Sequence, residues 1–176
     1  MLPKVVRTER LVLRLPRLED AEPIFESWGR DPEVARFLVQ WPHGSIDDTR
    51  QFLQKILDDW SGRTSFQWVI TKEPDDAPMG IISVRFNRHA AMVSYAVARS
   101  EWGKGYATEA LQAVLDSALG VPGVYRAWAY CDLENRASAR VMEKAGMLKE
   151  GILRRYARQP NISAEPRDAY VYAKVR

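Results

Sequence analysis

The sequence is poor in cysteine and histidine, with one cysteine and two histidines among its 176 residues. A single cysteine, Cys131, cannot form an internal disulfide, so a fold that depends on oxidation is excluded. Without clusters of cysteine and histidine, we expect neither a structural nor a catalytic zinc site, and hence no metal. A lone cysteine also fits the reducing environment of the cytoplasm, where we expect the protein to act.

Long apolar runs and a strong excess of one charge are also missing. No run approaches the ~20 apolar residues that a membrane-spanning helix needs. Met1–Arg10 is short and charged and lacks the apolar core of a signal peptide. The net charge is only +3, from 26 basic and 23 acidic side chains, whereas a nucleic-acid-binding protein usually presents a strongly basic face. We therefore expect neither a membrane nor a nucleic acid as partner.

The chain does contain enough apolar material for one sizeable core. Hydrophobic residues make up 46% of the sequence and charged residues 28%, which is ordinary for a globular protein. The sequence has no internal repeat, no low-complexity stretch and no long linker. A length of 176 residues then predicts a single domain over residues 1–176.

The first half of the sequence predicts helices followed by an antiparallel sheet. Residues 10–15 alternate as in a short strand, and helices are expected over residues 19–28 and 31–37 and in a third segment that runs to about Trp60. Asp47 or Asp48 is expected to cap the third of these helices. Three β-rich runs with short connections predict an antiparallel meander, namely Phe66–Thr71, Met79–Asn87 and Met92–Ala98.

The second half predicts one β-α-β crossing and two further strands. A helix is expected over Thr108–Leu119, because glycine and proline follow it directly. The next predicted elements are a strand, a helix closed by Gly146, and two β-like runs. Their ranges are Val124–Cys131, Arg136–Ala145, Leu148–Tyr156 and Ala169–Val175.

A glycine-rich turn lies between a predicted strand and a predicted helix. Gly103 and Gly105 allow backbone angles that other residues resist, and they let a ligand approach the main chain closely. The first turn of a helix carries N–H groups without partners and a partial positive charge, which together can hold a pyrophosphate. Lys104 adds a further positive charge. The turn therefore predicts a diphosphate site.

Three interpretations of this turn compete. A Walker loop needs serine or threonine directly after its lysine, whereas Gly105 follows Lys104. A dinucleotide-binding turn needs a third glycine where Thr108 stands, although Asp132 ends the next strand about where a ribose-binding acid would lie. The preceding strands look antiparallel, and too few residues follow Asp132 for the second half of a doubly wound sheet. A turn that binds nothing is the simplest alternative.

Several stretches of the sequence carry a family resemblance when they are taken together. They are Thr8–Arg14, Trp41–His43, Trp102–Leu111, Asn135–Met147 and Arg167–Tyr172. In order and spacing they resemble the GCN5-related N-acetyltransferase (GNAT) superfamily, and within it the ribosomal-protein N-terminal acetyltransferases. The resemblance extends over nearly the whole chain.

The resemblance implies a fold, a reaction and a set of binding residues. The fold is α+β, with a strongly twisted, mostly antiparallel sheet flanked by helices and a V-shaped split between two central strands. The reaction is direct attack of a primary amine, from a protein or peptide N-terminus or a small molecule, on acetyl-CoA. A homodimer is common in the family. The implied cofactor contacts are backbone groups of Tyr95, Ala96 and Val97 for the pantetheine arm, backbone groups of Trp102, Gly103, Lys104, Gly105, Tyr106, Ala107 and Thr108 for the pyrophosphate, and the side chain of Asn135. Ser138 is our own further candidate for a cofactor contact.

The acid of this reaction departs from the family pattern. Many members place a tyrosine seven residues after the asparagine, where this chain has Met142, which cannot donate a proton. Ser138 lies one helical turn after Asn135 and is the residue we expect to protonate the departing thiolate. The alternative is that Ser138 is a small residue required by packing.

The base of the reaction is also not obvious. The positions at which relatives often carry a glutamate are Met92 and Tyr130 here. Tyr130 is our catalytic candidate, and Asp132, His43 or an ordered water chain are alternatives. The absence of the family's tyrosine and glutamate keeps a non-catalytic acyl-CoA-binding module open, and the glycine turn keeps a nucleotide-dependent oxidoreductase open.

Three further features have alternative interpretations. Cys131 neighbours Asp132, whose charge raises a thiol pKa, so we expect a buried strand residue and not an acetyl-cysteine nucleophile. Five aromatic residues line an acceptor pocket or belong to the core: Trp28, Phe37, Trp41, Trp60 and Trp68. Four basic residues form a solvated face or contact an acidic acceptor or the 3′-phosphate of the cofactor: Arg154, Arg155, Arg158 and Arg167.

Overall fold

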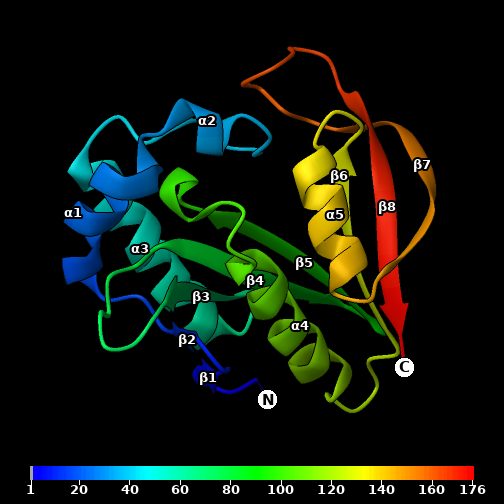
Figure 1. The fold of residues 1–176 in the computed structure, drawn as a ribbon, viewed down its shortest axis with the longest axis horizontal. Helices are drawn as coiled ribbons and strands as arrows, with labels where there is room; N and C mark the ends of the chain where they lie inside the picture. Colours follow the sequence, from blue (N-terminus) through cyan, green and yellow to red (C-terminus); the bar gives the residue numbers. More distant parts are fainter. Residues whose placement is uncertain (1) are drawn as a thin grey trace.

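An eight-stranded sheet runs through the computed structural model, which describes residues 2–176 (Figure 1). Its strands are β1 (Val5–Arg7), β2 (Val12–Arg14), β3 (Phe66–Thr71), β4 (Gly80–Asn87), β5 (Ala90–Val97), β6 (Arg126–Asp132), β7 (Leu148–Ala157) and β8 (Arg167–Val175). The spatial order is β1-β2-β3-β4-β5-β6-β8-β7. Among the strands within residues 2–176, only β5 and β6 pair in parallel, so the predicted mostly antiparallel sheet is confirmed.

Helices connect and cover the strands. They are η1 (Leu18–Asp20), α1 (Ala21–Ile24), η2 (Phe25–Gly29), α2 (Pro32–Ala35), α3 (Ile46–Gly62), η3 (Arg99–Glu101), α4 (Tyr106–Leu119) and α5 (Arg136–Lys144). α4 connects the parallel strands β5 and β6, which is the predicted β-α-β crossing. It buries one apolar stripe against the sheet, formed by Ala110, Leu111, Val114, Leu115, Ala118 and Leu119.

The parallel strands β5 and β6 separate along their length. Their last paired residues are Met92 and Trp128. Beyond this point, residues 93–97 of β5 pair with β4, and residues 129–132 of β6 pair with β8. The predicted V-shaped split between two central strands is therefore present, and it opens towards the C-terminal ends of both strands.

Element boundaries differ from the predictions where local chemistry was misread. β1 was not predicted, because three residues are too short to show an alternation. Ser45, and not Asp47 or Asp48, caps α3: its side-chain oxygen accepts the N–H of Asp48 at 3.1 Å. The helix predicted over residues 19–28 is divided among η1, α1 and η2.

The predicted start of α4 at Thr108 is also wrong. The helix begins two residues earlier, at Tyr106, because Gly105 takes the N-cap position in a left-handed conformation with φ 84°. The glycine turn and the helix are thus continuous. None of the helices within residues 2–176 has the length and apolarity needed to cross a membrane.

Candidate active site

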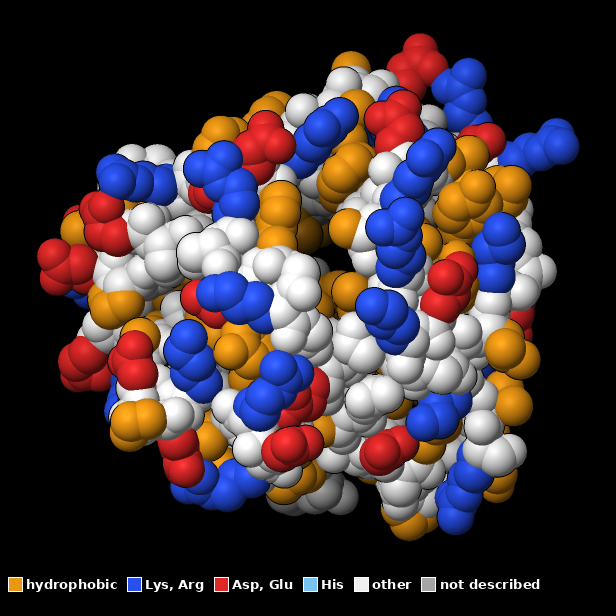
Figure 2. All heavy atoms as spheres, viewed as in Figure 1, with side chains coloured by type: hydrophobic (Ala, Val, Ile, Leu, Met, Phe, Trp, Pro, Cys, Tyr) orange, Lys and Arg blue, Asp and Glu red, His pale blue; other side chains and the backbone are white. Residues whose placement is uncertain are grey.

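A cavity of about 1410 Å³ lies where β5 and β6 separate. Its walls come from β4, β5 and β6, from the first turns of α4 and α5, and from the segment around α2. Figure 2 shows a hollow at the centre of this face with hydrophobic side chains at its depth and a column of basic side chains over α5. Arg136, Arg140 and Lys144 recur at every fourth residue of that helix, and the last two line the cavity.

The glycine turn presents free main-chain donors to this cavity. Gly103 and Gly105 have φ angles of 77° and 84°, which favour glycine. The first main-chain bond of α4 runs from Glu109 N–H to the Gly105 oxygen at 3.1 Å. Within residues 2–176, no partner is found for the N–H groups of the preceding turn, which belong to Gly103, Lys104, Gly105, Tyr106, Ala107 and Thr108. Together with the helix dipole, these donors suit a pyrophosphate.

The N-terminal stretch of the chain holds this turn in place. Thr8 Oγ1 donates to Glu109 Oε1 at 2.6 Å, the Arg10 N–H donates to the same oxygen at 2.9 Å, and Arg10 Nε donates to Oε2 at 2.7 Å. Arg10 also donates to the carbonyl oxygen of Lys104 at 3.1 Å. Burial alone would raise the pKa of Glu109, but the bonds from Thr8 and Arg10 lower it, so the carboxylate stays charged. This network fixes the orientation of the turn.

Two residues of the turn use their side chains within the protein. The Lys104 ammonium lies 3.1 Å from Glu101 Oε2, and Lys104 is not among the residues of 2–176 that line the cavity. The Trp102 indole N–H donates to the Val97 carbonyl oxygen at 2.8 Å, which ties the turn to the end of β5. Lys104 can therefore contribute to a diphosphate site through its backbone, but its charge is already paired.

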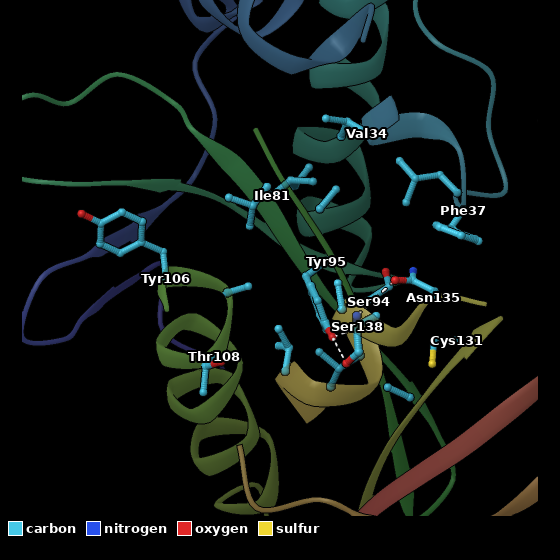
Figure 3. Close-up of a pocket in the computed structure, with 18 of the residues that line it drawn as sticks. Val34, Phe37, Ile81, Ser94, Tyr95, Tyr106, Thr108, Cys131, Asn135 and Ser138 are labelled. Atoms are coloured by element: carbon cyan, nitrogen blue, oxygen red, sulfur yellow. Dashed lines mark hydrogen bonds between the residues drawn. The ribbon is translucent and has the colours of Figure 1, made fainter. Parts of the chain in front are cut away.

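The start of α5 brings polar groups to the opposite wall of the cavity. Asn135 Oδ1 accepts the N–H of Ser138 at 3.1 Å and so caps the helix. Ser138 Oγ lies 2.8 Å from the hydroxyl oxygen of Tyr95, which reaches across from β5 (Figure 3). All three residues line the cavity. The structure thus brings the predicted strand residues and the predicted helix residues together.

Tyr130 also lines the cavity and lies edge-on to Tyr156, with ring centroids 5.1 Å apart. Burial raises the pKa of its hydroxyl, and Tyr156 adds to the effect, while the nearby Arg85 opposes it. The phenol therefore stays protonated at neutral pH. In that form it donates a hydrogen bond to an occupant of the cavity more readily than it removes a proton.

The other two side chains named as bases lie outside the cavity. Asp132 is 1% exposed and accepts from Arg167 Nε at 2.6 Å. Burial would raise the pKa of Asp132, but the bonds from Arg167 outweigh it and lower the pKa. His43 Nδ1 lies 2.7 Å from Thr49 Oγ1, and burial lowers the pKa of its ring. Since neither is among the residues of 2–176 that line the cavity, we discard both as bases.

The aromatic residues divide between the core and the cavity. Trp60 and Trp68 are buried and lie edge-on to each other, 5.2 Å apart. Trp28 and Phe37 line the cavity, whereas Trp41 is 64% exposed and lies outside it. Only two of the five aromatic candidates are therefore placed to meet an acceptor.

Cys131 is a buried strand residue, as predicted, although it also lines the cavity. Burial, with the charges of Asp132 and Glu143, raises its pKa to about 12, so the thiol is not a nucleophile at neutral pH. The predicted basic stretch does not reach this site, because its four arginines are absent from the cavity lining within residues 2–176: Arg154, Arg155, Arg158 and Arg167.

Sequence reasoning missed several residues that line the cavity. Arg85 on β4 pairs in register with Met92 on β5, next to the point of separation, and its side chain faces the split. Glu33 and Arg36 from the α2 segment and Gln159 from the loop before β8 also line the cavity. Nothing in the sequence marks these residues, because their meeting depends on the register of distant segments.

Comparisons with known proteins agree with this geometry. Residues 10–148 match the Acetyltransferase (GNAT) domain family. The uncharacterized N-acetyltransferase p20 of Bacillus licheniformis is 32% identical over 152 residues, which cover 85% of each chain. A GNAT-family acetyltransferase of Bacillus anthracis superposes with a TM-score of 0.83 at 28% identity, covering 97% of this chain and 98% of that one. The ribosomal L7/L12 acetyltransferase RimL, solved with coenzyme A, shares the fold at a TM-score of 0.84 and 18% identity, covering 97% of each chain.

Proposed function

The chain belongs to the GNAT acetyltransferase family and is an acetyl-CoA-dependent acetyltransferase, and we propose that its acceptor is a primary amine. The amine is that of a protein or peptide N-terminus or of a small molecule. Family membership removes the nucleotide-dependent oxidoreductase from consideration. It also disfavours a module that only binds acyl-CoA.

One observation carries the cofactor side of this proposal: the free N–H groups at the start of α4 face the same cavity as the gap between β5 and β6. A diphosphate bound by those donors would leave its thiol arm free to enter the gap. We propose that the main-chain donors of residues 103–108 hold the pyrophosphate, that the edge of β5 at Tyr95, Ala96 and Val97 pairs with the pantetheine arm, and that Asn135 and Ser138 contact it from α5. Trp102, which the sequence also assigned to the pyrophosphate, is not among these donors, because its N–H donates to the Arg99 carbonyl oxygen at 3.2 Å.

The reaction then follows from proximity and hydrogen bonding. The amine nitrogen attacks the thioester carbonyl, and a β5 N–H near Val97 stabilises the oxyanion. When the C–S bond breaks, its electron pair goes to sulfur, which takes a proton from Ser138 Oγ. The proton that the amine loses leaves through solvent, with Tyr130 as a hydrogen-bond donor beside the acceptor.

The acceptor end of the cavity carries charges of both signs. Glu33, Arg36 and Arg85 line it, and none of the three forms an ion pair within residues 2–176. Glu33 can hold an ammonium group, and the two arginines can hold a carboxylate, phosphate or carbonyl oxygen. This arrangement suits an acceptor that combines an amine with an acidic or carbonyl group, as a peptide N-terminus does.

Release of free thiol from acetyl-CoA tests the proposed function. The purified protein is given acetyl-CoA and a panel of N-terminal peptides, amino acid amides, alkylamines and alcohols. We expect amines to accelerate thiol release and to carry the acetyl group when analysed by mass spectrometry. If coenzyme A binds but no amine accelerates the release of free thiol from acetyl-CoA, the amine acceptor is refuted.

Asn135 offers a test of cofactor contact that is separate from helix capping. Asn135→Asp keeps a good capping oxygen but loses the amide donor, so we expect coenzyme A to bind about fivefold more weakly, the value of about one hydrogen bond. Asn135→Ala loses the cap as well and is expected to cost about 1 kcal/mol of stability in addition. Calorimetric titration and urea unfolding measure the two effects. Wild-type affinity in Asn135→Asp would show that this side chain only caps α5.

A further inference from the structure

Two hydroxyl groups meet across the split, one from each side. Tyr95 lies on β5 and Ser138 in α5, and their side-chain oxygens are 2.8 Å apart (Figure 3). The Tyr95 hydroxyl also donates to the backbone carbonyl oxygen of Ser138 at 3.1 Å. Both side chains line the cavity. A tyrosine from β5 thus reaches the first turns of the helix that carries Met142 in place of the family's tyrosine.

Each hydroxyl has one proton, so the 2.8 Å contact between the two oxygens can have either of them as its donor. If Tyr95 donates to the backbone carbonyl of Ser138, the Ser138 proton points back to the tyrosine oxygen and is used within the pair. If Tyr95 donates to Ser138 Oγ, the Ser138 proton is free to point into the cavity. The second arrangement prevails when an anion develops in the cavity, because each bond in the chain then polarises the next.

The surroundings of Tyr95 keep it in the role of donor. Burial raises the pKa of its hydroxyl well above the usual value, and the bond to Ser138 offsets this only in part. The charged and titratable groups that act on it are Cys131 and Tyr172. Tyr95 therefore keeps its proton throughout the neutral range and can direct a neighbouring hydroxyl without becoming charged.

We propose that Tyr95 is a positioning residue for acetyl transfer: its hydroxyl donates to Ser138 Oγ and so turns the Ser138 proton towards the departing thiolate. The inference rests on the proposed function. As the C–S bond breaks, Ser138 gives its proton to sulfur, and the proton that the amine loses on forming the C–N bond returns to Ser138 through solvent. The net result is the transfer of one proton from amine to thiol.

Tyr95→Phe removes the hydroxyl and keeps the ring that fills the space. We expect kcat to fall about tenfold, while the Kd for coenzyme A changes by less than about twofold. Tyr172→Phe is the matched control, because the Tyr172 hydroxyl also donates to α5, at 2.9 Å from Glu143 Oε1. Tyr172 is not among the residues of 2–176 that line the cavity, so the kcat of Tyr172→Phe is expected to equal that of the wild type.

A double variant tests whether Tyr95 acts through Ser138. Adding Tyr95→Phe to Ser138→Ala is expected to leave the kcat of Ser138→Ala unchanged, because the hydroxyl that Tyr95 directs is already gone. The inference is overturned if Tyr95→Phe retains wild-type kcat, or if Tyr172→Phe lowers kcat as much as Tyr95→Phe does. It is also overturned if the fold-losses in kcat of Tyr95→Phe and Ser138→Ala multiply in the double variant. Absence of amine-dependent thiol release in the wild type would instead refute the proposed function.

Discussion

Replacing Gly103 by valine is expected to weaken the binding of coenzyme A about 100-fold, which corresponds to about 2.7 kcal/mol. Gly103 has a φ of 77°, a conformation that a β-branched residue adopts only with strain. If the turn relaxes to relieve that strain, about two charge-assisted hydrogen bonds to the diphosphate are lost, each worth about 1.5 kcal/mol. If the turn does not relax, the new side chain occupies the path of the ligand.

Gly123 provides the matched control for this experiment. Its φ is 83°, and a Cβ added at either glycine meets nothing within 4 Å, so both valine variants place a branched side chain at a similar positive φ without a steric clash. Gly123 lies in the turn after α4, outside the cavity lining found within residues 2–176. We expect both variants to lose about 1–2 kcal/mol of stability and only Gly103→Val to lose affinity in a calorimetric titration. Equal coenzyme A affinity for the two variants would refute the diphosphate site.

The turn itself was predictable because its chemistry is local. Two glycines followed by an apolar helical stripe specify positive φ angles and a helix start within a few residues. The antiparallel meander was predictable for the same reason, since short connections leave neighbouring strands little choice of partner. The start of the helix was placed at Thr108 and not at Tyr106, because sequence alone does not show which glycine takes the N-cap position.

The acceptor side of the cavity was not predictable, because it depends on contacts between distant segments. Arg85 faces the split only because β4 and β5 pair in one register, and a shift by one residue would turn its side chain to the other face. Gln159 reaches the cavity from the loop before β8, and its side chain donates to the carbonyl oxygen of Phe37 at 3.4 Å. Neither position carries a motif.

The candidate bases also depend on contacts with distant residues that the sequence does not show. Asp132 is a plausible base by sequence because it ends a strand shortly before Asn135, but sequence spacing gives no sign of Arg167, which lies 35 residues later and pairs with its carboxylate. The contact between the Tyr95 and Ser138 hydroxyls was likewise not predictable, because the two residues lie 43 positions apart on separate elements. Local motifs therefore predicted the glycine turn, and long-range register decided which other side chains line the cavity.

Asp132→Asn is expected to destabilise the protein by about 2 kcal/mol, because the buried carboxylate loses its charge-assisted bonds to Arg167, whose guanidinium is 26% exposed and keeps Glu134 as a second partner at 3.0 Å. Asp132 is 1% exposed and also accepts the N–H of Glu134 at 2.8 Å, just before α5. The substitution keeps Oδ1 for that bond, removes the charge, and replaces Oδ2, which accepts from Arg167 Nε, by an amide nitrogen that cannot accept. Urea unfolding measures the loss, and Asp116→Asn is the control, since its partner Lys174 lies 3.1 Å away at the surface and the pair is worth about 0.5 kcal/mol.

The pH dependence separates loss of charge from loss of packing in the same variant. The pKa of Asp132 is lowered by folding, so its contribution is fully present above the unfolded value of 3.8 and disappears as the pH falls through the folded value. The stabilities of the wild type and Asp132→Asn are therefore expected to converge in acid and to differ most near neutral pH. A constant difference at every pH would mean that the carboxylate stabilises β6 and α5 by shape alone. The folded fraction of the variant should turn over acetyl-CoA at the wild-type rate, because Asp132 anchors the end of the split without facing the reacting groups.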